Sequence, residues 1–110
     1  MFTPVFQHSA VYTLKESVSY AEGAVVSKIV TKNNAGNLTL FAFDQNQSLS
    51  KHSAPFDAVI QVLEGKARIT INEQPFELSE GQMIIMPANI PHAVDALEKF
   101  KMMLIMIKGF

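Results

Sequence analysis

The sequence contains no cysteine among its 110 residues. This absence excludes disulfide bonds, thiolate ligands for a metal and a cysteine nucleophile. Any metal bound by the chain would have to use nitrogen and oxygen ligands, and the sequence offers only three histidines.

An excess of one charge is also lacking. Nine Lys and Arg residues stand against ten Asp and Glu residues, for a net charge of −1, and the basic residues are spread along the chain. Proteins that bind nucleic acids gather basic side chains into a patch that neutralises phosphates. We therefore expect no nucleic-acid partner.

Long hydrophobic runs are missing as well. No stretch approaches the roughly 18 uninterrupted apolar residues that a membrane-spanning helix requires. The first 23 residues lack the basic start and the continuous apolar stretch of a signal peptide. We expect a cytoplasmic protein with no membrane partner.

Helix signals are scarce, and from residue 24 onward the chain consists of short β-type runs separated by turn residues. This pattern is typical of an all-β sandwich or barrel. The length fits a single domain, residues 1–110, with the β structure in 24–110 and an N-terminal segment in 1–23. Residues 12–20 fit a short strand or a single helical turn. The predicted strands are residues 24–32, 38–43, 58–64, 82–87, 92–96 and 101–108, with a hairpin over 66–80 that turns at 72–75.

The last predicted strand is apolar on both faces. Strand alternation places Met102, Leu104 and Met106 on one face, and Met103, Ile105 and Ile107 on the other. The second face needs a cover, so we predict a homodimer with sheet packed on sheet. The alternative is that residues 1–23 fold back over this face.

Two segments, HSAPFDAVIQVLEG (52–65) and GQMIIMPANIPHA (81–93), each contain one histidine, His52 and His92. Their glycines, prolines and intervals resemble the two motifs of the cupin superfamily, specifically of small single-domain bacterial cupins. The resemblance implies a jelly-roll barrel, also called a double-stranded β-helix. In metal-binding cupins, the first motif supplies two histidines and a glutamate and the second a further histidine. Here Ala54 and Ala58 stand where the second histidine and the glutamate would be.

The metal motif is therefore degenerate. Catalytic zinc sites commonly have three protein ligands, and open iron sites use two histidines and a carboxylate. Strand parity points Asp57, Gln61 and Asp95 outward, so only His52 and His92 remain as metal ligands. We therefore expect that the site holds no metal, with a weakly bound divalent ion such as Zn, Fe, Mn or Ni as the alternative.

The same two histidines are candidate polar anchors for a small ligand inside the barrel. His52 lies in a polar stretch, so the alternative is that it is an exposed loop residue. His92 follows the rigid segment between Pro87 and Pro91, which favours a position in the pocket. The third histidine, His8, lies outside both motifs and is interpreted as structural or exposed. The predicted cavity walls are Ile60, Val62 and Met86, with Ile69 and Ile71 as further candidates.

Three functions follow from this pattern. The first is a small-molecule-binding cupin that uses His52 and His92. The second is a metal-dependent cupin enzyme of the dioxygenase, isomerase or decarboxylase type with a reduced two-histidine site. The third is a structural or interaction module whose barrel is filled by its own side chains.

Overall fold

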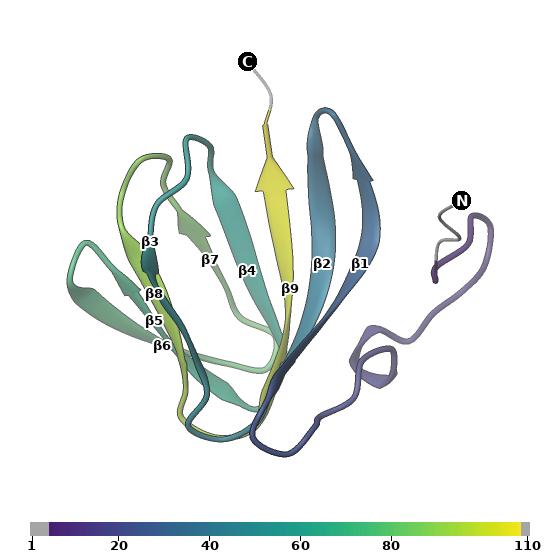
Figure 1. Ribbon diagram of the computed structural model, residues 1–110, viewed down its shortest axis with the longest axis horizontal. Coiled ribbons are helices and arrows are strands. Elements are labelled where there is room, and N and C mark those ends of the chain that lie inside the picture. The colour runs from purple at the N-terminus through teal and green to yellow at the C-terminus, as the bar shows by residue number, and fades with distance from the viewer. Residues whose placement is uncertain (1–4, 109–110) are drawn as a thin grey trace.

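Two antiparallel sheets face each other in the computed structural model, which describes residues 5–108 (Figure 1). This confirms the predicted all-β jelly-roll fold. The five-stranded sheet has the order β1 (Val25–Asn33), β2 (Gly36–Phe43), β9 (Phe100–Ile107), β4 (Ala58–Glu64) and β7 (Met83–Met86). The four-stranded sheet has the order β3 (Ser48–His52), β8 (His92–Ala96), β5 (Lys66–Ile71) and β6 (Gln74–Ser79).

The main core fills the space between the two sheets. Alternation along β4 directs Ile60 and Val62 inward, and both are fully buried. Ile69 on β5 meets them from the opposite sheet. Phe43 and Phe100 stack with ring centroids 4.5 Å apart and close the end of the core away from the histidines.

The turns follow from the residues that occupy them. Asn72 and Glu73 have φ values of 50° and 68°, as the two central residues of a hairpin turn require. Gly65 has φ +82° and lies against the backbone of Lys99, where a Cβ atom would clash with the carbonyl oxygen. The hairpin predicted at residues 72–75 is present between β5 and β6.

One strand was missed by sequence reasoning. Residues 48–52 form β3, although the sequence there reads as a polar loop. Among residues 5–108, β3 is an edge strand with β8 as its only neighbour. Leu49 is its one apolar residue, so no alternating pattern marks it.

The N-terminal segment packs on the outer face of the five-stranded sheet. Within it, residues 12–20 contain one turn of 3-10 helix, η1 (Leu14–Glu16), which is the second of the two predicted forms. Phe6 and Val18 pack against Leu40 and Ala42 of β2. The described residues include no helix with the length and apolar character of a membrane span.

The Tyr20 hydroxyl fixes the end of this segment by donating a hydrogen bond of 2.6 Å to Glu64 Oε2. Burial, with a further contribution from that bond, raises the pKa of Tyr20 above its usual value, so the hydroxyl stays protonated. The segment therefore covers part of the outer face, which is what the alternative to the dimer predicted.

Candidate functional site

A cavity of about 50 Å³ opens between the two sheets at the end of the barrel that carries the histidines. Side chains from β3, β4, β7, β8 and β9 line it, and all of them except the two histidines are apolar. Met86, Met102 and Met106 contribute three of the walls. Methionine is flexible and polarisable, so these walls can adjust to the shape of an occupant.

His52 and His92 lie together at this cavity. They are register partners across the β3–β8 ladder, and their ring centroids are 4.5 Å apart at an interplanar angle of 70°. His92 is only 5% exposed, whereas His52 is exposed. The pair therefore joins a buried imidazole inside the cavity to a solvent-facing one at its entrance.

Backbone contacts define which nitrogen of each ring is protonated. His52 Nδ1 lies 2.9 Å from the carbonyl oxygen of Ser50, and His92 Nδ1 lies 3.3 Å from that of Ile90. A carbonyl oxygen can only accept a hydrogen bond, so each Nδ1 carries the proton and donates it. In the neutral form of each ring, Nε2 is then the hydrogen-bond acceptor.

The charge state of His92 follows from its burial. Desolvation, helped by the neighbouring His52 ring, lowers the pKa of His92 below its ordinary value of 6.5, and the contact with Ile90 opposes this only in part. His92 is thus neutral at pH 7. It presents an acceptor nitrogen rather than a positive charge.

The segment between Pro87 and Pro91 forms a rim that is tied to the loop opposite. The Asn89 amide donates a hydrogen bond of 2.7 Å to the Ala54 carbonyl oxygen, and the Ala88 amide donates one of 2.9 Å to Asp57 Oδ1. Asn89 has φ 66°, a conformation that asparagine tolerates better than most residues. These contacts fix the entrance of the cavity on two sides.

The structure divides the predicted wall residues. Ile60 and Met86 line the cavity, whereas Val62 lies deeper in the core and does not. The same holds for Ile69, which is fully buried, and for Ile71, which packs against the core from β5. Strand parity selects the correct face of β4, but it carries no information on how far along the strand the cavity extends.

Several residues that line the cavity lie outside the set of five predicted walls. Leu104 and the methionines Met102 and Met106 line the cavity from β9, and Leu49 and Val94 do so from β3 and β8. The signal for the β9 residues was present, since alternation groups all three on one face. The sequence does not indicate which of the two apolar faces of β9 points into the barrel.

The remaining polar candidates lie elsewhere. Asp57 and Asp95 are exposed, and Gln61 lies on the outer face of β4, in agreement with their predicted outward parity. His8 is exposed in the N-terminal segment. None of these four side chains reaches the cavity.

The side chains present do not fit a catalytic metal site. Across residues 5–108, no three His, Cys, Asp or Glu side chains are grouped so that they could hold an ion. Ala54 and Ala58 both line the cavity beside the two histidines, so methyl groups stand where further ligands would be needed. Two imidazoles alone fall short of the three ligands of a catalytic zinc.

A family model described as a cupin domain matches residues 39–108 of the chain. The chain belongs to the cupin family. The match runs from β2 to the end of β9 and includes every residue of the histidine cavity. No curated protein matches this cupin.

Solved structures support the assignment. A conserved protein of unknown function from Streptococcus pyogenes is 35% identical with a TM-score of 0.90, over 96% of this chain and 92% of its own. A cupin 2 conserved barrel domain protein from Leptotrichia buccalis is 40% identical with a TM-score of 0.86, over 88% of this chain. This cupin spans about half, 47%, of the Leptotrichia protein's length. A cupin superfamily protein from Desulfitobacterium hafniense, at 24% identity and a TM-score of 0.88 over 94% and 95% of the two chains, shares the fold.

Proposed function

We propose that this cupin binds a small molecule in its barrel, with His52 and His92 as the polar anchors. The observation that carries the proposal is the histidine pair itself. Two rings 4.5 Å apart stand at an otherwise apolar cavity, and each is oriented by a hydrogen bond from Nδ1 to a backbone carbonyl. A cavity with apolar walls and a few convergent polar groups is the usual form of a ligand site.

The chemistry of the pair limits the ligand. A neutral His92 with an acceptor Nε2 favours a partner that donates a hydrogen bond, such as a hydroxyl or an amide N–H. A cavity of about 50 Å³ has room for only about three to five water-sized groups. The ligand therefore presents a compact head, with any larger part extending past His52 into solvent.

Titration with short alcohols and amides, such as propanol and propionamide, tests this proposal. We expect saturable shifts of the His52 and His92 ring signals by NMR, lost in His52→Ala and in His92→Ala. The His8→Ala variant removes the histidine outside the cavity and serves as the matched control. Binding that survives both cavity substitutions, or that is lost equally in His8→Ala, would contradict the proposal.

A metal-dependent reaction is the second candidate, because the hydrogen bonds from both Nδ1 atoms to carbonyl oxygens leave both Nε2 atoms as possible ligands. The ligand set argues against it, as two imidazoles without a carboxylate give a weak site. Elemental analysis of protein purified without added metal separates the candidates. Near-stoichiometric Fe, Mn, Ni or Zn that disappears in His52→Ala and His92→Ala would favour the enzyme.

We also propose that the partner of this chain is a second copy of itself. On the outer face, Ile85 of β7, Val59 of β4 and Ile105 of β9 are cross-strand neighbours and form one apolar row. Ile85 and Ile107 are 54% and 56% exposed, and the N-terminal segment packs on a different part of this sheet. Such a row on one face favours sheet-on-sheet pairing.

Light scattering coupled to gel filtration tests the dimer. Wild type is expected at twice the chain mass and Ile85→Lys at the chain mass. Val11→Lys changes a fully exposed side chain outside the row and is the matched control. A wild-type monomer, or a dimer that Ile85→Lys leaves intact, would refute the proposed interface.

A further inference from the structure

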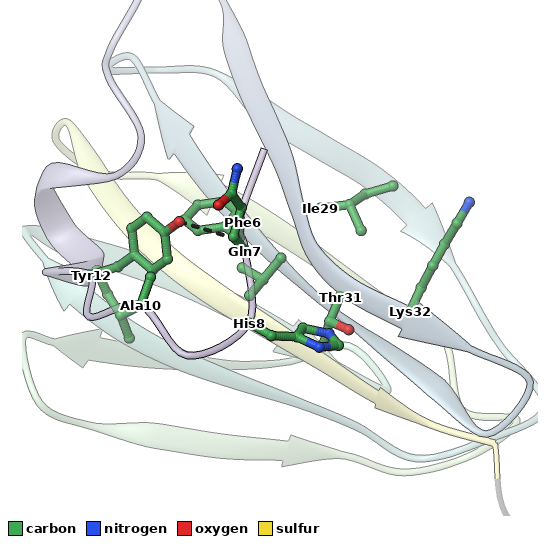
Figure 2. A pocket seen from close by; sticks show the side chains of 10 residues that line it. Phe6, Gln7, His8, Ala10, Tyr12, Ile29, Thr31 and Lys32 are labelled. Atoms are coloured by element: carbon green, nitrogen blue, oxygen red, sulfur yellow. Dashed lines mark hydrogen bonds between the residues drawn. The ribbon is translucent and has the colours of Figure 1, made fainter. Parts of the chain in front are cut away.

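A second concave site, larger than the histidine cavity, is a groove beside the sheet edge. It has a volume of about 570 Å³ and runs between β1 and residues 6–14 of the N-terminal segment (Figure 2). We call it the N-terminal groove. Its volume lies within the roughly 300–1,000 Å³ of small-molecule sites.

A bulge in β1 shapes one wall. The register with β2 shifts between Ile29 and Thr31, so Val30 has no partner on the neighbouring strand. Ile29, Val30, Thr31 and Lys32 all line the groove, although successive residues of a regular strand point to opposite faces. β-Bulges redirect side chains in this way and are common near functional sites.

The opposite wall is a closed loop of the N-terminal segment. The Gln7 amide donates a hydrogen bond of 3.0 Å to the Tyr12 hydroxyl oxygen, drawn as a dashed line in Figure 2. The rings of Phe6 and Tyr12 meet edge to face with centroids 4.9 Å apart. Ser9 turns the chain between them with φ 60°. Both walls are thus fixed by contacts within the chain.

The lining combines an apolar floor with polar groups that carry no negative charge. Phe6, Leu14 and Val30 supply the floor, and His8 and Lys32 supply donors. No Asp or Glu lines the groove, and Lys32 forms no ion pair within the part of the chain that the structure describes. An unpaired cation beside apolar surface is complementary to an anion on an apolar body.

We propose that the N-terminal groove binds a small organic anion, a carboxylate carried on an apolar body, with Lys32 at the carboxylate. A second strand paired along β1 is the competing occupant, since β1 is an edge strand. The bulge at Val30 interrupts the regular row of backbone groups that such a strand needs. Bulges and lysines on edges are features that disfavour strand addition.

Titration of the full-length chain with 4-phenylbutyrate, followed by backbone amide NMR, tests the proposal. Its amide, 4-phenylbutyramide, keeps the apolar body without the charge, and acetate keeps the charge without the body. Lys32→Gln removes the cation of the groove. Lys28→Gln removes a lysine of the same strand that does not line the groove, and is the matched control.

We expect saturable shifts at residues 6–12 and 29–32 with phenylbutyrate, and much weaker ones with acetate. Lys32→Gln should weaken binding about threefold, as for a partly solvated ion pair, and Lys28→Gln should leave it unchanged. The proposal is overturned by no binding at millimolar concentration, by equal binding of the amide, or by equal loss in Lys28→Gln. It is also overturned by shifts centred on His92 instead, or by shifts at 29–32 that follow protein concentration, which would assign the groove to a second copy.

Discussion

Restoring the two missing ligands is the most direct test of how the histidine cavity is interpreted. The double substitution Ala54→His and Ala58→Glu places two ligand side chains in the cavity that His52 and His92 already line. With three imidazoles and a carboxylate directed at one space, we expect the variant to bind a divalent metal such as Zn²⁺. The parent chain, with two imidazoles, should not retain one.

The burial of Ala58 determines how strongly the substitution should change the free energy of unfolding. This residue is 3% exposed, so without metal the introduced carboxylate is buried with no fixed cation beside it. Such a group lowers the free energy of unfolding by several kcal/mol, or remains protonated to avoid that cost. Metal at about a hundred times its dissociation constant returns about 2.7 kcal/mol. For a domain of this size, that return raises Tm by roughly 10–20 °C.

The assay is thermal unfolding with Zn²⁺ and with a chelator, together with elemental analysis after gel filtration. The variant should unfold below wild type in chelator and recover with Zn²⁺, whereas wild type should respond to neither. Replacing Ala58 by Gln in the Ala54→His background keeps the size of the side chain and removes the charge, so it should recover much less. A near-stoichiometric metal in wild type, or no metal in the double variant, would refute the reasoning.

Three further predictions concern the framework of the site. Gly65→Ala should lower the free energy of unfolding by about 2–5 kcal/mol in urea titrations, and Gly81→Ala by about 1–2 kcal/mol. Both glycines have positive φ, but of the two only Gly65 has backbone atoms within reach of an added Cβ atom. The pKa of His92 is lower in the folded chain than in the unfolded chain, so the unfolded chain binds the proton first as pH falls. The contribution of neutral His92 to the free energy of unfolding should therefore be complete above pH 6.5 and be lost as pH falls through the lowered pKa. His92→Gln should flatten this part of the profile of stability against pH. Tyr20→Phe removes the hydrogen bond to Glu64 and should cost about 1 kcal/mol, with faster proteolysis of the N-terminal segment. Equal costs at the two glycines, an unchanged pH profile or unchanged proteolysis would contradict these statements one by one.

Sequence reasoning succeeded where local geometry determines the outcome. Alternation along β4 placed Ala58 and Ile60 inward because neighbouring residues of a strand point to opposite faces. The resemblance of the two histidine segments to the cupin motifs indicated the fold, and their glycines and prolines mark turns that the barrel needs. The turn at Asn72 was visible for the same reason.

It failed where the decisive contacts are between distant segments. β3 carries no apolar pattern and is a strand only because β8 lies beside it. The depth of the cavity depends on which face of β9 turns inward. The two faces of β9 are equally apolar in sequence, with Met102 on one and Met103 on the other, so the sequence does not decide between them. The bulge at Val30 has no sequence signal either, because it reflects how β1 pairs with β2 and packs against the cluster that contains Phe6 and Val18.

The size of the histidine cavity is the quantity on which the proposed function turns. Ala54 and Ala58 are smaller than the histidine and glutamate of metal-binding cupins, yet a cavity of only about 50 Å³ lies beside them. Met86, Met102 and Met106 line it, and Met106 is only half-buried. Because methionine changes shape at little cost, a ligand head larger than this volume can enter by displacing such a side chain toward the mouth. The volume of about 50 Å³ therefore limits the head of a ligand only as long as these methionine side chains keep their positions.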